Sequence, residues 1–263
     1  GTSLLTTDNI PPRNAFSYRQ DVICDTFIHL ECSAPERRRF EGAIVNQPYS
    51  ELQISTMTSD EIDVRRTRQI ISAAREEYCI VVFQGRGQTL GEQDGRQVVL
   101  DEGDIALFDS ARPYFARLKA GFQHFVFKVP RELLRQRLGP LETYSAIRIP
   151  GGRGVGRLAS EYMRRLPGEL QSMDPTMLDR VAEISIELTA AALASTRNGV
   201  PPSESSARVV RLARAKNVID GDLHKPELST ATIAAEMGIS GRYLNMLFAA
   251  EQTSVGRYLW DRR

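Results

Sequence analysis

Short apolar stretches, separated by Gly, Asp, Ser and Pro, fill the sequence from about residue 37 to 130. Val, Ile and Phe are common in these stretches, which is typical of β-strands. The stretches are RFEGAIVN, SELQIST, EIDVRRT, EYCIVVFQG, GRQVVL, GDIALFD, YFARL and HFVFKV. Asp94-Gly95 and Glu102-Gly103 predict tight turns, because glycine tolerates the positive φ that such turns need. The pattern predicts an all-β barrel or sandwich.

Helical periodicity flanks this region on both sides. A helix is predicted after Pro11-Pro12 from the near-helical spacing of four apolar residues: Val22, Ile23, Phe27 and Leu30. Between about residues 130 and 196 the helical stretches are RELLRQRLG, VGRLASEYMRRL and DPTMLDRVAEISIELTAAALAST. The last of these begins with Asp174 as a predicted N-cap and Pro175 at the first helical position.

The predicted helix over 174–196 carries apolar residues at alternating steps of four and three, the spacing of a packing seam: Met177, Val181, Ile184, Leu188 and Ala191. A second apolar row widens this face. Two interpretations stay open. The helix packs on the barrel of its own chain, or it supplies the surface of a homodimer.

Residues 197–206, RNGVPPSESS, have the composition of a linker. An amphipathic helix follows, and then TATIAAEMGISGRYLNMLFA, which we tested against the requirements of a helix-turn-helix. Ala234 is the small contact residue, Gly238 is the turn residue, and Ser229 and Ser240 are predicted N-caps. The required apolar positions are Ile233, Met237, Ile239, Leu244 and Leu247.

The second of these two helices leaves Arg242, Asn245 and Met246 on its outer side when Leu244, Leu247 and Phe248 face inward. Arginine pairs with guanine and asparagine with adenine, and a methionine can contact a thymine methyl group. We therefore expect these three residues to contact bases. Backbone amides at Ser240 and Gly241, together with Arg257, are expected to hold phosphates.

The C-terminal stretch ELSTATIAAEMGISGRYLNMLFAAEQTSVGRYLWDRR resembles the first helix-turn-helix and the start of the linker helix of the AraC/XylS family of bacterial transcription regulators. Upstream, GRGQTLGEQDGRQVVLDEGDIALFDSARPYFARL and HFVFKVPRELL are similar to the cupin-like sensor domain of XylS-type members. The resemblance implies double-stranded DNA, a small and often aromatic effector, and RNA polymerase as partners. This sequence differs from the family at Met246, where many members have a basic residue. The resemblance covers only the first of the family's two helix-turn-helix units.

The sequence offers little support for an enzyme. Its three histidines, His29, His124 and His224, form no HxH pair of the kind that holds metal in cupin enzymes. Ser110 lacks the glycines of a hydrolase elbow, and GGRGVGR lacks the lysine-serine ending of a phosphate loop. We predict no catalytic residue, metal or cofactor. The alternatives are a cupin-class enzyme and a regulator whose barrel binds a protein.

A small β-barrel can hold one small ligand among its inward-facing side chains. Alternation along the strands sorts the candidate residues onto faces, but the sequence does not say which face points inward. The residues that we expect to contact an effector are Tyr78, Ile80, Val82, Phe125 and Phe127.

Charge and composition add limits to this picture. The formal net charge is +1, so a nucleic-acid surface must come from local arrangement. Three cysteines without CxxC spacing predict free thiols, and the absence of a signal peptide or long apolar run predicts a cytoplasmic protein. The predicted fold class is α+β: a cupin-like sensor and dimerisation domain over 13–196, a linker over 197–206, and an all-α DNA-binding domain over 207–263.

Overall fold

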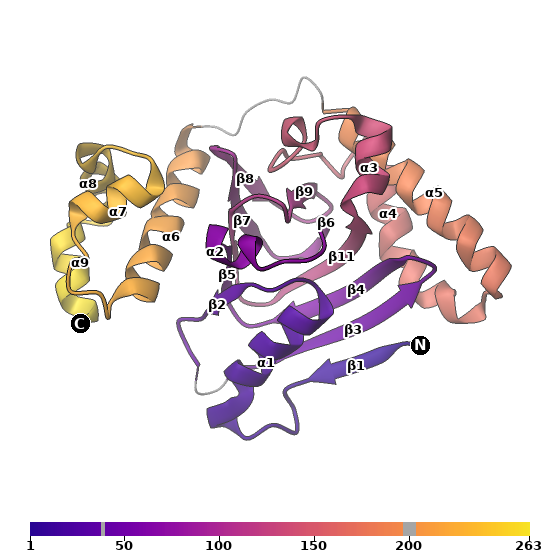
Figure 1. The fold of residues 1–263 in the computed structure, drawn as a ribbon, viewed down its shortest axis with the longest axis horizontal. Helices are drawn as coiled ribbons and strands as arrows, with labels where there is room; N and C mark the ends of the chain where they lie inside the picture. The colour runs from indigo at the N-terminus through magenta and orange to yellow at the C-terminus, as the bar shows by residue number, and fades with distance from the viewer. Residues whose placement is uncertain (38–39, 197–203) are drawn as a thin grey trace. The chain divides into compact units, whose positions relative to one another are not determined.

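The computed structural model describes residues 1–37, 40–196 and 204–263 of the 263-residue chain. The chain divides into two compact units, Gly1–Pro201 and Pro202–Arg263, and each is described by itself (Figure 1). Most of the predicted linker, residues 197–203, lies outside the described residues. Its last three residues do not form a linker, because helix α6 begins at Glu204. The polar Ser and Glu residues at the start of that helix have the composition of a loop, so the sequence pattern did not show where the helix begins.

The first unit contains two antiparallel sheets that face each other (Figure 1). One is six-stranded, in the order β1-β3-β4-β11-β6-β9, and the other is five-stranded, in the order β2-β5-β10-β7-β8. The strands are β1 Ser3–Thr6, β2 Glu31–Ser33, β3 Gly42–Tyr49, β4 Leu52–Ser59, β5 Ile62–Arg66, β6 Tyr78–Arg86, β7 Thr89–Gln93, β8 Arg96–Leu100, β9 Ile105–Asp109, β10 Tyr114–Leu118 and β11 Phe122–Pro130.

Each stretch predicted as extended from its apolar pattern overlaps one of these strands, whereas β7 lies outside those stretches. The hairpin predicted at Asp94-Gly95 joins β7 to β8, and both residues have positive φ, at 53° and 74°. Strands β1 and β2 lie outside the predicted barrel, and β1 pairs with β3 and β2 with β5. Both strands are short edge strands, and an alternation over three or four residues is too weak to detect.

Helices lie between the strands of the first unit and after them along the chain. They are α1 Pro12–Thr26, α2 Arg68–Ser72, α3 Arg131–Leu138, α4 Gly154–Glu169 and α5 Pro175–Ala194, with 3₁₀ turns at Leu141–Thr143 and Leu170–Ser172. Asp174 caps α5 as predicted, accepting a hydrogen bond of 2.9 Å from the amide of Met177. The predicted N-terminal helix exists but is shorter, because α1 ends at Thr26 and leaves Phe27 and Leu30 in the segment that follows.

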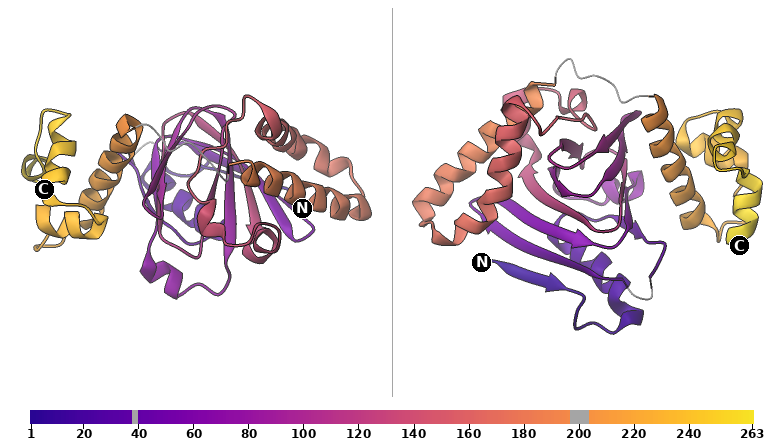
Figure 2. Two further views of the ribbon diagram at one scale, coloured as in Figure 1. Left: turned by 90° about the horizontal axis from the view of Figure 1, so that it is seen from above. Right: turned by 180° about the vertical axis from the view of Figure 1, so that it is seen from behind.

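Two hydrophobic cores occupy the two faces of the six-stranded sheet. On one face Val81, Phe83 and Phe127 pack against α4 and α5, where Met163 and Ile186 are buried. These helices run along that side of the sheet in both views of Figure 2. On the other face Ile80, Val82 and Val126 pack against residues of the five-stranded sheet and of α1. The second core therefore lies between the two sheets.

Asp109, the last residue of β9, connects the barrel to the helical layer. Its carboxylate is fully buried and accepts hydrogen bonds from Arg131 on α3 at 3.0 Å and from Arg112 at 3.1 Å. It also accepts from the amide of Ala111 at 3.0 Å. A buried charge of this kind is stabilised only while its cationic partners stay in place.

The second unit consists of four helices: α6 Glu204–Asp222, α7 Thr230–Met237, α8 Gly241–Ala249 and α9 Val255–Arg262. Gly238 ends α7 in the left-handed conformation, at φ 66° and ψ 31°, and α8 starts three residues later. Ser229 and Ser240 cap α7 and α8. The core contains Val218, Ile233, Leu244 and Phe248. Among the described residues, no helix combines the length and apolar character that crossing a membrane requires.

Candidate functional sites

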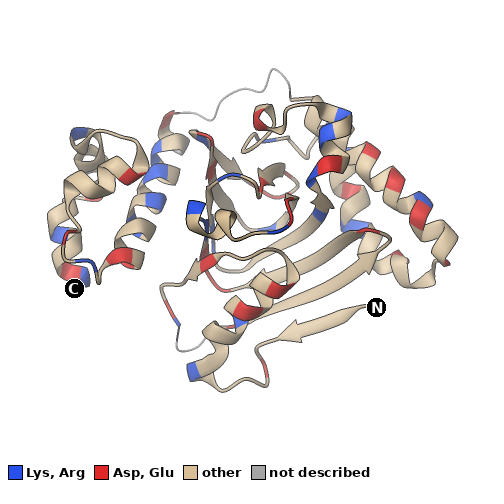
Figure 3. Ribbon diagram, viewed as in Figure 1, with Lys and Arg blue, Asp and Glu red and all other residues tan. Residues whose placement is uncertain are grey.

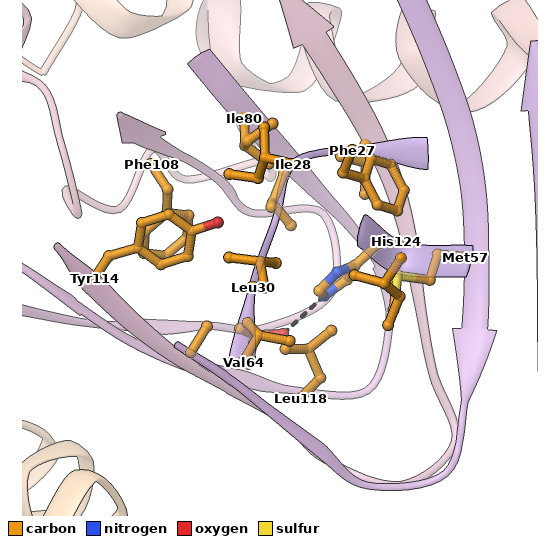
Figure 4. Close-up of a pocket in the computed structure, with 15 residues that line it drawn as sticks. Phe27, Ile28, Leu30, Met57, Val64, Ile80, Phe108, Tyr114, Leu118 and His124 are labelled. Carbon is orange, nitrogen blue, oxygen red and sulfur yellow. Dashed lines mark hydrogen bonds between the residues drawn. The ribbon is translucent and has the colours of Figure 1, made fainter. Parts of the chain in front are cut away.

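A cavity of about 60 Å³ lies between the two sheets of the first unit (Figure 4). Strands of both sheets contribute to its wall, and α1 and the segment after it contribute the rest. The lining residues are Ile23, Phe27, Ile28, Leu30, Met57, Val64, Ile80, Val82, Thr89, Phe108, Tyr114, Ala116, Leu118, His124 and Val126. An apolar cavity of about 150 Å³ can hold benzene, so this cavity takes only a smaller molecule unless its wall moves.

His124 is one of the few polar residues in this wall. Its Nε2 lies 2.7 Å from Oγ1 of Thr89 and 3.0 Å from Oε1 of Gln84. The Gln84 amide nitrogen donates to the carbonyl of Arg86, so the oxygen of that amide faces the histidine ring and only accepts. This network assigns the proton to Nε2 and leaves a lone pair on Nδ1. Complete burial lowers the pKa of His124 to about 3, so the ring is neutral at neutral pH.

Tyr114 supplies a second polar group. The hydroxyl points into the cavity from the side opposite His124 (Figure 4). The ring stacks at a tilt on Phe108, with centroids 5.2 Å apart, and within the described residues the hydroxyl makes no hydrogen bond. Burial raises the pKa of Tyr114, so the group remains a neutral donor and acceptor.

The segment that follows α1 covers one side of the cavity with Phe27, Ile28 and Leu30. Polar contacts hold its main chain in place. Gln53 donates to the carbonyl of Thr26 at 2.9 Å, and Arg66 donates to the carbonyl of His29 at 2.8 Å. The thiol of Cys24 lies 3.5 Å from both the amide and the carbonyl of Leu30. These contacts fix the apolar side chains of the segment against the barrel.

Of the residues predicted to contact an effector, only Ile80 and Val82 line the cavity. Phe125 and Phe127 belong to the core beneath α4 and α5, on the opposite face of the sheet. The pairing of β6 with β11 is the reason, since it sets Val82 against Val126 and Phe83 against Phe125. Residues paired across two strands share a face.

Tyr78 also lies outside the cavity wall. Its hydroxyl donates to Glu76, and the amine of Lys128 lies 4.2 Å from the centre of its ring. The hydrogen bond to Glu76, aided by burial, raises the pKa of Tyr78 to about 12. Its first position on β6 places it at the end of the strand, beyond the enclosed space.

The polar residues that line the cavity were not predicted from the sequence. His124 was considered only as a metal ligand, and Thr89 and Tyr114 were not singled out. A signal existed for Tyr114, because it alternates with Ala116 and Leu118 on β10, and all three line the cavity. No feature of the sequence near Thr89 identifies it as a cavity residue. Its role depends on its contact with His124, which lies 35 residues further along the chain.

The residues predicted for dimerisation divide between two environments. Met177 and Ile184 are exposed, at 47% and 53%, whereas Val181 is buried in the core and Leu188 is half-buried against it. Helix α5 therefore packs on its own domain with one face and exposes large apolar side chains on the adjacent face. A surface with exposed methionine and isoleucine is available on α5.

The residues predicted to contact DNA are all accessible in the second unit. Arg242, Asn245 and Met246 are exposed on α8, while Leu244, Leu247 and Phe248 on the same helix are buried. The Asn245 side chain donates to the carbonyl of Gly241 at 3.1 Å. Ser240 is exposed at the start of α8 and Gly241 is half-buried there, whereas Arg257 is exposed on α9. The helix thus has one packed face and one open face.

Metal coordination finds no support in the ranges that the structure describes, where no three His, Cys, Asp or Glu side chains are grouped to hold an ion. His124 is the only histidine in the cavity wall, and its Nε2 is occupied by Thr89 and Gln84.

The chain is similar to proteins of a known family. Residues 20–194 match the family described as the AraC-binding-like domain. The chain is 32% identical over 238 residues to an uncharacterised protein encoded in the nit 5′ region of Bacillus sp. (strain OxB-1), covering 90% of this chain and 92% of that one. It is 30% identical over 244 residues to the transcriptional activator NphR of Rhodococcus sp., covering 90% of this chain and 71% of the relative.

The fold is similar to the crystal structure of the AraC-like transcriptional activator CuxR, with a TM-score of 0.67 and 19% identity over 100% of this chain and 93% of that chain. The sheets, the enclosed cavity and the helical layer all fall within residues 20–194 apart from β1 and the start of α1. The chain belongs to the family of the AraC-binding-like domain.

Proposed function

We propose that this protein is a sequence-specific DNA-binding transcription regulator, controlled by a small molecule that binds in the cavity of the first unit. The observation that carries the proposal is that α8 has one buried face and one exposed face. Its buried residues fix it to α6 and α7, and Arg242, Asn245 and Met246 remain exposed. Two helices joined by a tight turn at a left-handed glycine have the form of a helix-turn-helix, whose second helix enters the major groove.

Base recognition is assigned to Arg242 and Asn245. The planar guanidinium of Arg242 can donate two hydrogen bonds to guanine, and the amide of Asn245 can both donate to and accept from adenine. Both side chains lie within the first half of α8. Met246, exposed at 42%, offers an apolar contact for a thymine methyl group.

Phosphate binding is assigned to the start of α8 and to cations around it. The backbone amides at Ser240 and Gly241, at the start of α8, and the positive end of the helix dipole favour an anion. Arg257 on α9 is exposed, and Lys and Arg recur along α6 (Figure 3). Arg211 on α6 donates to the Tyr243 hydroxyl at 2.8 Å, which connects this row of cations to α8.

The experiment is selection of binding sites from random double-stranded DNA with the 263-residue protein, followed by titration of the selected site. Arg242→Ala should weaken binding to that site by about 1 to 3 kcal/mol and should relax the preference at one base pair only. Arg157→Ala is the matched control, since Arg157 lies exposed on α4 and pairs with Glu161. Equal weakening on every sequence would show that Arg242 binds phosphate.

We propose further that two copies associate through α5, because a regulator that reads two half-sites is usually a symmetric dimer. Met177 and Ile184 supply the exposed apolar contacts. Ile184→Glu should shift sedimentation from dimer to monomer, and Glu183→Gln, at the neighbouring exposed position, should leave it unchanged. A monomer at all concentrations in the unmodified protein would contradict this part of the proposal.

The direction of control proposed is activation, because the relative NphR is a transcriptional activator. A second candidate function, a cupin-class enzyme, has no specific observation in its favour.

A further inference from the structure

The cavity wall is informative about the charge of its ligand. Apart from Thr89, Tyr114 and His124, the described residues that line the cavity are all apolar, with no Lys, Arg, Asp or Glu among them. The three polar residues are neutral at neutral pH, because His124 resists protonation and Tyr114 keeps its proton. A charged ligand would lose its hydration here without gaining a counter-ion.

Arg66 is a charged residue that pairs with Tyr114 across β5 and β10 and faces the same side of the sheet. Its guanidinium is already engaged. Nε donates to the carbonyl of Ser110 at 3.1 Å, and Nη1 donates to the carbonyl of His29 at 2.8 Å. Arg66 therefore holds the chain that closes the cavity and does not line the cavity itself.

The Tyr114 hydroxyl is a hydrogen-bond donor that this arrangement leaves for a ligand, beside the lone pair on Nδ1 of His124. It points into the cavity and has no hydrogen-bond partner among the described residues (Figure 4). His124, in contrast, already uses its Nε2 proton on Thr89 and Gln84. A buried hydroxyl without a partner is unfavourable, so a ligand atom that accepts its hydrogen bond gains affinity there.

We propose that the cavity binds an uncharged, mainly apolar small molecule, one polar atom of which accepts a hydrogen bond from the Tyr114 hydroxyl. This inference rests on the proposed function and specifies the chemical class of the effector. Carboxylates and ammonium ions are excluded from the site. A cavity of about 60 Å³ is well below the roughly 150 Å³ that holds benzene, so an alcohol or ketone of comparable size requires the segment from Phe27 to Leu30 to move outward.

The test uses matched pairs of probes that differ in charge: 2-methylpropan-1-ol and isobutyrate, cyclohexylmethanol and cyclohexanecarboxylate, benzyl alcohol and benzoate. Binding at pH 7 is followed by the methyl NMR signals of Ile80, Val82 and Leu118, which line the cavity. At least one alcohol should bind saturably. Its acid should bind at least about a hundredfold more weakly, which corresponds to about 2.7 kcal/mol. An acid that binds as tightly as its alcohol, or a panel in which no alcohol binds, overturns the proposal.

Variants locate the binding and test the hydrogen bond. Tyr114→Phe should weaken the alcohol by about fivefold, as expected for loss of one neutral hydrogen bond. Tyr78→Phe is the matched control and should bind as the unmodified protein does, because Tyr78 is outside the cavity wall. Ala116→Leu fills the cavity and should abolish saturable binding. Unchanged binding in Tyr114→Phe, with circular dichroism showing a folded protein, would refute the assigned hydrogen bond.

The two proposals fail separately. If the protein selects a DNA sequence but binds none of the alcohols, the effector class is wrong and the regulatory function stands. If the alcohols bind in the cavity but no DNA sequence is selected, the ligand class stands and the proposed function is wrong.

Discussion

The buried His124 predicts a specific dependence of stability on pH. Burial lowers its pKa to about 3 in the folded protein, whereas an unfolded histidine has a pKa of about 6.5. The folded state therefore holds the neutral ring, and between these two values the unfolded state binds the extra proton. The resulting stability is fully present above pH 6.5 and is lost as the pH falls toward 3.

The magnitude follows from those two pKa values. Linkage gives a loss of about 1.4 kcal/mol per pH unit well inside the window, and about 2 kcal/mol in total between pH 7 and pH 5. His124→Gln removes the titrating group. The free energy of unfolding of the unmodified protein, minus that of the variant, should therefore fall by about 2 kcal/mol between pH 7 and pH 5.

The assay is urea denaturation followed by far-ultraviolet circular dichroism at a series of pH values. Tryptophan fluorescence would be the wrong probe, because Trp260 is the one tryptophan and lies on α9 in the second unit. His224→Gln serves as the control, since His224 is exposed between α6 and α7 and its replacement leaves His124 in place. This control should keep the pH dependence of the unmodified protein.

A flat difference between the unmodified protein and His124→Gln across pH 5 to 7 would refute the reasoning. It would mean that the ring gains a proton in the folded state with its ordinary pKa, and hence that water or a counter-charge reaches it. The apolar wall described above would then be wrong as a description of the cavity in solution.

Three further predictions concern packing, a buried charge and a helix cap. Gly91→Ala should lower the free energy of unfolding by about 1 to 3 kcal/mol, because the new Cβ would lie 2.6 Å from Cζ of Phe108; Gly152→Ala, with open space around it, is the control, and equal effects would contradict the packing argument. Asp109→Asn should lower the free energy of unfolding by about 3 kcal/mol in the same denaturation assay, because two arginines lose their shared buried carboxylate. A change below about 1 kcal/mol would show that solvent stabilises the two arginines equally well. Ser229→Ala should destabilise the second unit by about 1 kcal/mol, measured by Trp260 fluorescence, and an unchanged midpoint would show that the capping box of α7 contributes nothing.

The sequence by itself determined the local elements of this protein. Apolar alternation located most of the strands but not β1, β2 or β7. Asp94-Gly95 specified a hairpin because both residues adopt positive φ, and Asp174 specified the start of α5. On α8, helical spacing alone separated the buried Leu244 from the exposed Arg242. Each of these features depends on contacts between residues close in the chain, so a short window of sequence contains the necessary information.

Which face of each strand encloses the cavity follows only from how the strands and sheets pack together. Alternation predicts two faces for β6 and two for β11, but only their register shows that Val82 shares a face with Val126, which places Phe125 and Phe127 under the helices. The packing of the two sheets brings Thr89 on β7 to His124 on β11, 35 residues away. A shift of one residue exchanges the two faces of a strand, and no local pattern fixes that shift. The identity of the cavity wall is therefore a property of strand pairing over long distances in the sequence.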